Sequence, residues 1–272
     1  MSKSPKGETP DSSSEKEMSF LDHLEELRWH IIRSIIAIVL IGILVFWQSQ
    51  LVIDILFAPR FKTFPTYRFI CRNFDVFCEV PQFQMIYKDL GERFFTHLKT
   101  SIWLGIILGF PYLFWEFWRF IKPGLYEHER KATRGMVGIC TLLFFSGVLF
   151  GYFIIAPFAI SFLAGYQFGT DDSEVSSTLS SYVSYMTLIT LPTGIVFQLP
   201  VVAYFLGKAG IIGSDTMKKF RRHAIVVIFI MAAIITPPDI ITQFLIALPL
   251  MGLYQIGIIA VKRIEKKRAQ ED

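Results

Sequence analysis

Residues 136–158 read MVGICTLLFFSGVLFGYFIIAPF, an apolar run that contains no charged side chain. As a helix, this stretch would rise about 35 Å, which is enough to cross the roughly 30 Å hydrocarbon core of a bilayer. An uncharged run longer than about 18 residues is typical of a membrane-spanning helix and is too long for most buried helices of soluble proteins. The stretch therefore predicts a membrane protein.

Five further apolar segments accompany this one. They run over residues 31–47, 98–118, 182–206, 223–235 and 240–261. The composition agrees, since 53% of the 272 residues are apolar and 18% are charged, with a mean hydropathy of +0.47. These values exclude a disordered chain and disfavour a soluble enzyme. We predict an all-α polytopic membrane protein with six transmembrane helices, the last two forming a shallow hairpin because the fifth is short.

The basic residues indicate how the chain lies in the membrane. Of its 27 Lys and Arg residues, seven fall between residues 60 and 99, and the others fall in the segments on the opposite side of the predicted spans. Because cytoplasmic loops carry the excess of Lys and Arg, both termini are predicted to be cytoplasmic. The net charge of +4 is then a signal of membrane orientation, and no basic patch predicts nucleic-acid binding.

The two ends of the chain differ from its apolar middle. The N-terminal tail is rich in Ser, Lys and Glu, which predicts disorder and no cleavable signal peptide. Ser19 and Asp22 have the spacing of a capping box, so residues 20–29 are predicted to form an amphipathic helix on the cytoplasmic surface. The expected domains are a disordered cytoplasmic tail at 1–18, a six-helix membrane domain at 19–262 and a charged cytoplasmic tail at 263–272.

The segment 48–97 joins the first two predicted spans and is far longer than a usual connection. It is rich in aromatic residues, so we expect an ordered extracytoplasmic cap, with a helix that starts at Phe83 and continues past Gly91 into the second span. Cys71 and Cys78 lie close together in this loop, on the side that is oxidising in most bacteria. They form either a disulfide or two free thiols, and the sequence leaves both possibilities open.

Several kinds of chemistry are missing from the sequence. No glycine-rich phosphate loop is present, because Gly207 and Lys208 are followed by Ala209. The five histidines are scattered without His-Glu-x-x-His spacing, and no nucleophile elbow surrounds Ser146. We therefore expect no cofactor, no metal site and no enzymatic activity.

Few charged residues fall within the predicted spans. Arg33, Glu116 and Asp239 lie at helix ends, whereas a solute pump normally places acids or bases in its helix centres. Gln198 is a polar residue inside a span, and an interhelical hydrogen bond is its simplest interpretation. A proton relay within this chain is therefore disfavoured.

Two acidic clusters, HLEELR at 23–28 and LYEHER at 125–130, stand on the face where basic residues otherwise dominate. Alone, they are typical of exposed charge pairs at helix ends. Combined in order with Phe120, Pro123 and the TPPD turn at 236–239, they resemble the TatC family, the multispanning subunit of the twin-arginine protein translocase. The resemblance covers nearly the whole apolar part of the chain.

The resemblance implies which residues recognise a signal peptide that bears two adjacent arginines. They are Glu26, Arg28, Phe120, Pro123, Glu129 and Arg130. A guanidinium presents a planar fork that pairs bidentately with a carboxylate, so two arginines need two such acceptors, and lysine lacks that geometry. Glu25 stands where the family usually has an apolar residue. It is either an extra acid of the site or solvated, and we favour the second interpretation.

The resemblance also implies a group of residues that contact a partner helix or support the fold. They are Pro59, Gln198, Pro200, Pro237, Pro238, Asp239 and Gln243. Gln198 departs from the family, because many relatives carry Glu at this place and Gln cannot be charged. If the acid acts by charge, the mechanism here must differ. If it acts by hydrogen-bonding a partner helix, little changes, and we favour this second alternative.

As a TatC family member, the chain would be the receptor and core subunit of the translocase in the bacterial cytoplasmic (inner) membrane. Its expected partners are twin-arginine signal peptides of folded cargo proteins, small single-span subunits of the TatA and TatB type, membrane lipid and further copies of itself. The proton gradient would drive the export of folded proteins. A small-solute secondary transporter stays open as the alternative, and it would need a polar pocket near the membrane midplane.

Overall fold

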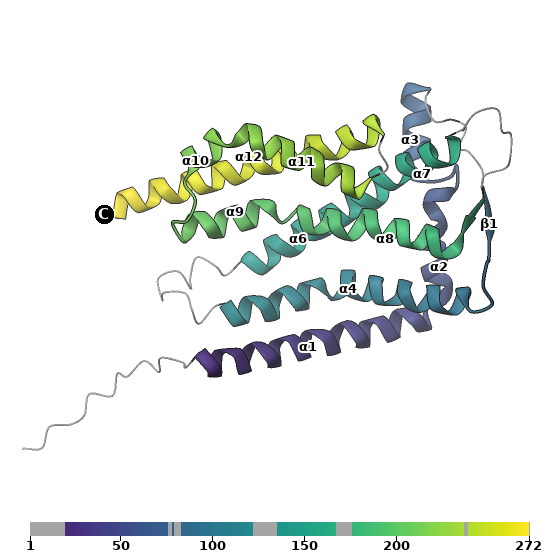
Figure 1. Ribbon diagram of the computed structural model, residues 1–272, viewed down its shortest axis with the longest axis horizontal. Coiled ribbons are helices and arrows are strands. Elements are labelled where there is room, and N and C mark those ends of the chain that lie inside the picture. The colour runs from purple at the N-terminus through teal and green to yellow at the C-terminus, as the bar shows by residue number, and fades with distance from the viewer. Residues whose placement is uncertain are drawn as a thin grey trace, which may run out of the picture.

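The computed structural model describes residues 20–75, 78, 83–121, 135–166, 176–236 and 239–271. The α-helices are α1 (Phe20–Trp47), α2 (Ser49–Phe57), α3 (Pro65–Phe74), α4 (Glu92–Ile121), α6 (Met136–Phe150), α7 (Ala156–Gly165), α8 (Leu179–Val196), α9 (Leu199–Lys208), α10 (Ser214–Lys219), α11 (Arg221–Ile235) and α12 (Ile240–Glu271). A 3-10 helix spans Ala58–Arg60, a π-helix spans Gly151–Ile155, and the strands are β1 (Gln84–Ile86) and β2 (Ser176–Thr178). Figure 1 shows the long helices lying side by side, with α2, α3 and β1 gathered at one end.

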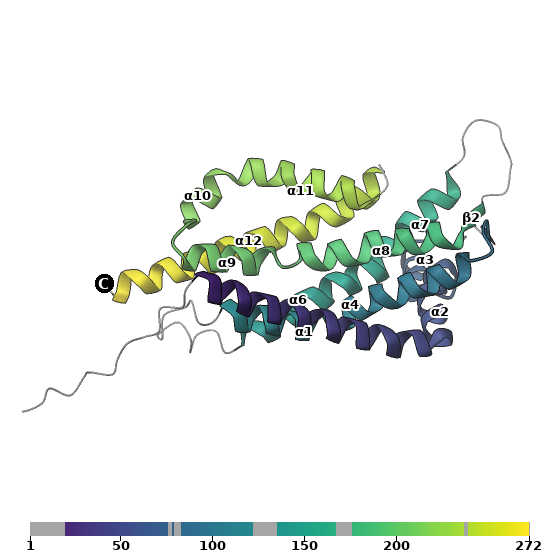
Figure 2. The ribbon, with the colours of Figure 1, turned by 60° about the horizontal axis from the view of Figure 1, so that its bottom comes forward.

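Five helical stretches are long and apolar enough to cross a membrane. They are Leu24–Trp47, Glu92–Ile121, Met136–Gly165, Leu179–Lys208 and Ile240–Gln270. The sixth predicted span corresponds to α11, whose 15 residues are fewer than a transmembrane helix usually needs. In Figures 1 and 2, α11 lies alongside α12, and the two helices are in contact. Five of the six predicted spans therefore have a matching long helix, and the complete six-span count stays a prediction.

The helices extend beyond the apolar segments that predicted them. Helix α1 is continuous, so the segment predicted as a separate surface helix and the first span form one rod. No Gly or Pro interrupts its sequence before Gly42, which explains why there is no break. Helix α12 likewise continues to Glu271, so the described part of the predicted charged tail is helical. Apolar content locates a span, but it does not locate the end of the helix.

The segment 48–97, called the cap below, is anchored to the third helical stretch. Pro157 has no N–H group to offer the carbonyl of Phe153, four residues earlier, and the hydroxyl of Thr66 in the cap donates to that carbonyl. The hydroxyl of Tyr67 donates to the carbonyl of Pro157 over 2.8 Å, and Ser161 donates to the Tyr67 oxygen over 3.1 Å. Burial raises the pKa of Tyr67 to about 12, so its hydroxyl keeps its proton to a higher pH than an exposed tyrosine does.

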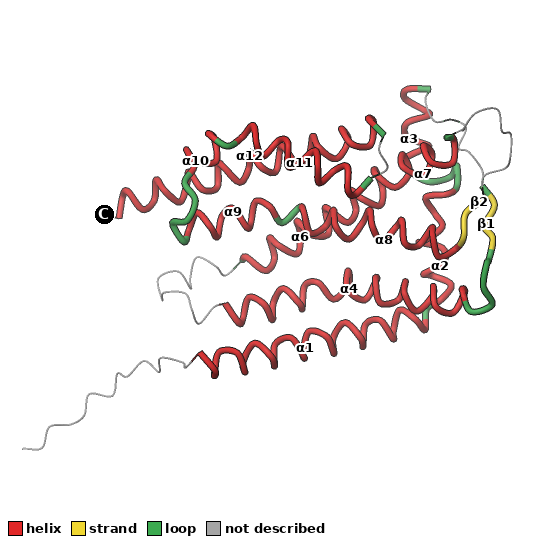
Figure 3. Tube along the Cα trace, viewed as in Figure 1, coloured by secondary structure: helices red, strands yellow, loops and turns green. Residues whose placement is uncertain are grey.

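The prediction of a helix that starts at Phe83 is wrong for the residues before Glu92. The backbone there is strand β1, which pairs in parallel with β2, and α4 begins only at Glu92 (Figure 3). The carboxylate of Glu92 accepts the N–H groups of Lys88 and Ser180 over 2.7 and 2.9 Å, which ties the start of α4 to the start of α8. Helical spacing did not reveal a strand this short, because its partner lies far away in the sequence. The described fold is thus all-α apart from this two-stranded sheet.

The cysteines of the cap are joined in the structure. A disulfide connects Cys71 of α3 to Cys78, whereas Cys140 of α6 is free and buried. A bridge between residues this close in sequence closes only a short loop of the cap. Its effect on the chain entropy of the unfolded state is correspondingly smaller than that of a long-range bridge.

Glycine allows α1 and α4 to approach closely. A Cβ atom at Gly105 of α4 would lie 2.9 Å from the backbone oxygen of Ile38 and 3.1 Å from the backbone nitrogen of Gly42, both on α1. Backbone atoms cannot turn away as a flexible side chain can, so a larger residue at position 105 would push the helices apart. This helix pair matters for function because the predicted site residues Glu26 and Phe120 belong to it.

We expect Gly105→Ala to destabilise the protein by about 1–3 kcal/mol, because even one methyl group there meets the backbone of α1. Thermal unfolding of the purified protein in detergent should show a lower Tm than that of the wild type. Gly252→Ala is the matched control, since no heavy atom lies within 4 Å of a Cβ atom placed there. Equal Tm values for the two variants would contradict the close packing of α1 on α4.

Candidate functional site

Helices α1 and α4 lie side by side and run in opposite directions, so the start of α1 lies beside the end of α4 (Figure 1). This arrangement brings together two residues of the predicted recognition site, Glu26 near the start of α1 and Phe120 at the end of α4. Arg28 is exposed on the same part of α1. The remaining predicted residues of this group, Pro123, Glu129 and Arg130, lie outside the described residues.

His30 is the residue at which these two side chains meet. It follows Glu26 by one helical turn on α1 and is only 6% exposed. Its Nε2 atom lies 3.9 Å from Oε1 of Glu26. Its ring meets that of Phe120 edge-on, with the ring centroids 6.1 Å apart. The imidazole therefore connects two residues that the sequence had assigned separately to the site.

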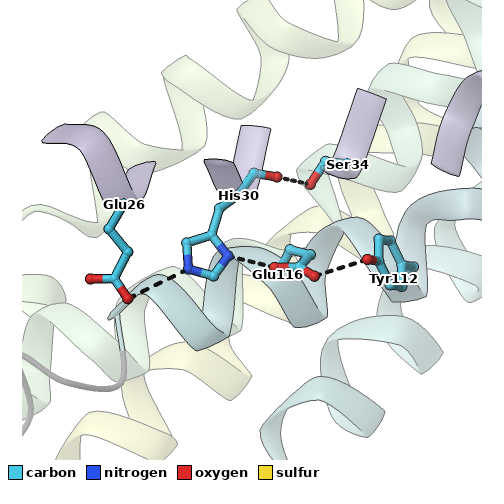
Figure 4. Close-up of polar contacts among 5 residues, drawn as sticks. All are labelled: Glu26, His30, Ser34, Tyr112 and Glu116. Carbon is cyan, nitrogen blue, oxygen red and sulfur yellow. Dashed lines mark hydrogen bonds and ion pairs between the residues drawn. The ribbon is translucent and has the colours of Figure 1, made fainter. Parts of the chain in front are cut away.

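The other side of the imidazole faces a buried acid of α4. Figure 4 shows the contacts: Nδ1–H of His30 donates to Oε2 of Glu116 over 2.5 Å, and the hydroxyl of Tyr112 donates to Oε1 over 2.9 Å. Glu116 is 1% exposed, and burying an ionised carboxylate is costly unless its oxygens are paired and hydrogen-bonded. Both of its oxygens are bonded. The prediction that Glu116 is simply an acid at a helix end was therefore incomplete.

The carboxylate of Glu26 is less fully bonded than that of Glu116. Its side chain is 37% exposed, so the residue can be reached from outside. Its Oε2 atom, however, is shielded from solvent and has no hydrogen-bond partner among the described residues. An acceptor that has lost water without gaining a donor costs free energy. An N–H group brought to this oxygen would therefore bind favourably.

The sequence prediction missed the role of His30, Tyr112 and Glu116. One local signal was available, since Glu26 and His30 are four residues apart, as are Tyr112 and Glu116, and side chains at this spacing meet on one helix face. The contact between the two pairs joins different helices. It depends on how α1 packs against α4, and a single sequence does not show that.

Known proteins resemble this chain over most of its length. A family model described as Sec-independent protein translocase protein (TatC) matches residues 22–249. The chain belongs to the TatC family. TatC of Desulforapulum autotrophicum is 35% identical over 261 residues, which are 96% of this chain and 90% of that protein. TatC of Blattabacterium sp. subsp. Periplaneta americana is 38% identical over 262 residues, covering 93% of this chain and 98% of that protein.

The TatC fold also extends over most of the chain. A crystal structure of a twin-arginine translocase receptor, TatC, is 36% identical and has a TM-score of 0.68, covering 89% of this chain and 99% of its own. A second crystal structure of such a receptor, in DDM, has the same identity and TM-score and covers 87% of this chain. The chain is thus a membrane component of a protein-transport system rather than an enzyme, and the small-solute transporter alternative is not favoured.

In this TatC family member, Gln198 lies between α8 and α9, and Pro200 is the second residue of α9. The side-chain amide of Gln198 donates to the backbone carbonyl of Cys140 on α6 over 3.0 Å. Its Oε1 atom is buried and has no hydrogen-bond partner among the described residues. The residue therefore forms an interhelical hydrogen bond through one end of the amide and retains an open acceptor at the other.

The acid at the end of the TPPD sequence of this TatC chain, Asp239, has a clear local role. One oxygen of the Asp239 carboxylate accepts the N–H group of Thr242 over 2.8 Å, and the other accepts the Thr242 hydroxyl. Asp239 therefore caps the start of α12. Gln243 donates to the carbonyl of Phe229 over 3.3 Å, which links α12 to α11.

The structure describes two of the four prolines that were predicted to contact a partner helix or support the fold, Pro59 and Pro200. Pro59 is buried in the 3-10 helix of the cap. Pro237 and Pro238 lie outside the described residues. Within the described ranges, no three His, Cys, Asp or Glu side chains gather into a group that could hold a metal ion.

Proposed function

We propose that this TatC family member is the receptor and core subunit of a twin-arginine translocase, and that Glu26 binds an arginine of the signal peptide. The observation that carries the proposal is the Glu26 carboxylate, which has a shielded oxygen without a hydrogen-bond partner among the described residues. This carboxylate lies 3.9 Å from His30, whose ring also contacts that of Phe120. The solved protein of 36% identity is described as a twin-arginine translocase receptor, which supports the same role here.

The chemistry of arginine fits this acceptor. A guanidinium carries five N–H donors in a planar fork, and two of them can bond to both oxygens of one carboxylate. The ammonium group of lysine is a point charge without that fork. One carboxylate serves one guanidinium, so the second arginine requires another acceptor. We assign that role to Glu129, with Arg28, Phe120, Pro123 and Arg130 completing the site.

The distribution of basic residues supports the membrane orientation. The excess of Lys and Arg at the two termini and in the segments after α4 and α9 is typical of cytoplasmic loops. We therefore place the chain in the bacterial cytoplasmic membrane with both termini in the cytoplasm. In this orientation Glu26 faces the compartment in which cargo proteins fold, and the cap lies on the opposite side.

We assign the binding of small single-span subunits of the TatA and TatB type to α11, α12 and the neighbouring Gln198 region. Helix α11 leaves apolar side chains uncovered, with Val226, Val227 and Ile230 each more than half exposed. A transmembrane helix of a partner subunit would cover them. The side-chain oxygen of Gln198 has no hydrogen-bond partner among the described residues and could accept one from a partner helix. Helix α9, which follows Gln198, packs against α12. Further copies of this chain would complete the assembly, and the proton gradient would drive export.

A crosslinking experiment tests the receptor role. A photoreactive amino acid replaces Leu24 of α1 or Arg119 of α4, both of which are exposed near the ends that carry Glu26 and Phe120. We expect a labelled twin-arginine peptide to form adducts at both positions. Replacing both peptide arginines by lysine should reduce the adducts about tenfold or more, because the planar fork is lost.

The control position for this experiment is Phe69, which is 65% exposed and belongs to the cap at the other end of the molecule (Figure 1). No adduct is expected there with either peptide. Equal adducts with the arginine and lysine peptides at Leu24 and Arg119 would overturn the receptor role.

A further inference from the structure

His30 contacts Glu26 and Phe120 of the proposed recognition site, but the proposed function gives it no role. It contacts Glu26 through Nε2, Glu116 through Nδ1 and Phe120 through the edge of its ring (Figure 4 shows the first two contacts). We propose that His30 is a positioning residue for Glu26, and that the proton on its imidazole sets how tightly the site binds paired arginines. The inference rests on the proposed receptor function and adds a proton-linked control of it.

The geometry determines which side of the ring responds to protonation. The 2.5 Å hydrogen bond to the buried carboxylate of Glu116 keeps a proton on Nδ1. The Tyr112 hydroxyl bonds to the other oxygen of that carboxylate, so the acid itself is held in place. A second proton therefore goes to Nε2, the atom that faces Glu26 at 3.9 Å. With this proton present, a cation lies 3.9 Å from the Glu26 carboxylate, and without it a neutral ring does.

Among the residues that the structure describes, the charged groups around the imidazole come from two helices. On α1, Glu26 faces Nε2, and on α4, Glu116 faces Nδ1 and is bonded to Tyr112. Two cations, Arg33 of α1 and Arg119 of α4, lie close enough to act on the Glu116 and Tyr112 pair. Loss of the Nε2 proton removes one positive charge from this set. The site becomes more negative by one unit, and it also loses the ion pair of His30 with Glu26, which competes with arginine for that carboxylate.

The loss of the positive charge and the loss of competition for Glu26 both strengthen the binding of arginine. A peptide with two arginines is attracted more strongly once His30 is neutral, so its affinity should rise with pH. Histidine is the side chain that ordinarily changes charge between about pH 5 and 8, whereas ordinary carboxylates and guanidinium groups do not. By linkage, binding of the dicationic peptide must in turn favour release of the His30 proton.

The test measures peptide binding to the purified full-length chain in lipid nanodiscs at pH 6.0, 7.0 and 8.0. The probe is a fluorescent twin-arginine peptide with a blocked N-terminus and no histidine, so that the peptide itself does not titrate. For the wild type we expect the Kd to fall about fivefold between pH 6.0 and 8.0, the size of one unit charge acting through a partly screened site. A flat wild-type profile would overturn the proposal.

His30→Asn is the informative variant, because the amide nitrogen of Asn replaces the Nδ1 donor to Glu116 but puts no titrating group beside Glu26. Its Kd should be independent of pH. Two controls should keep the wild-type slope. Ser34→Ala removes a hydroxyl that bonds only the backbone carbonyl of His30, and His223→Asn makes the same exchange at an exposed histidine of α11. A His30→Asn variant that retains the slope would overturn the proposal.

A second measurement needs no variant and applies even where His30→Asn does not fold. Calorimetric titration of the wild type at pH 7.0 in two buffers with different ionisation enthalpies should show that protons are released when the twin-arginine peptide binds. Absence of release would overturn the proposal. Glu26→Gln separates this result from the receptor role: wild-type affinity in that variant contradicts the role of Glu26, whereas lost affinity together with a flat wild-type pH profile contradicts only the role of His30.

Discussion

Replacing Glu26 by Gln is expected to abolish the export of folded twin-arginine cargo in cells whose chromosomal copy has been deleted. Gln has nearly the same size as Glu, but it lacks the charge and keeps only one acceptor oxygen. The guanidinium therefore loses both its bidentate geometry and the charge assistance of the bond. These contributions amount to about 3 kcal/mol, so the affinity for the signal peptide should fall about 100-fold.

Glu25→Gln is the matched control for this experiment, because it removes the same charge from the neighbouring position. Glu25 is exposed, in contrast to the half-buried Glu26. We expect export by the Glu25 variant to stay close to that of the wild type, which would support the interpretation of Glu25 as a solvated residue. Equal losses in the two variants would show that net charge matters rather than the Glu26 carboxylate itself, and the assignment would then fail.

The helical core of this fold was predictable from apolar runs alone. The run at 136–158 lies within one continuous helical stretch, Met136–Gly165, and 98–118 lies within α4. The helix ends were not predictable in this way, since polar residues such as Glu92 and Glu271 continue a helix without adding to its hydropathy. The β1 and β2 pair was missed because a parallel contact between distant three-residue segments leaves no periodic signal in either.

The residues of the candidate site also fall into those that local sequence patterns predicted and those that only the packing of helices revealed. Glu26 and Phe120 were found through motifs, each of which is a local pattern. His30 and Glu116 were not found, because neither stands out until α1 packs against α4 and puts the two side chains 2.5 Å apart. A sequence shows what one helix presents along its face. Which buried acid meets which base across a helix interface depends on the register of packing, which the glycine at position 105 helps to set.

Removing the buried acid should have the largest effect on stability. Glu116→Ala is expected to destabilise the folded chain by about 3–5 kcal/mol, the usual effect of breaking a buried pair by deleting one partner. The substitution leaves Nδ1–H of the buried His30 without its acceptor, and it also removes the acceptor of the Tyr112 hydroxyl, whose residue is 37% exposed. Thermal or denaturant unfolding of the purified protein measures the loss.

Two variants separate the loss of this pair from a general packing defect. Tyr112→Phe removes only one of the two donors, and Tyr112 is 37% exposed, so this variant should destabilise the chain less than Glu116→Ala does. Glu116→Gln keeps an oxygen that accepts from His30 or Tyr112, so its loss should lie between those of the other two variants. Destabilisation should therefore decrease from Glu116→Ala to Glu116→Gln to Tyr112→Phe. This order is expected only if Glu116 stabilises the packing of α1 on α4 through these hydrogen bonds. A Glu116→Ala variant no less stable than Tyr112→Phe would mean that the acid is not needed to hold His30, and Glu26 would then have to be positioned by something else.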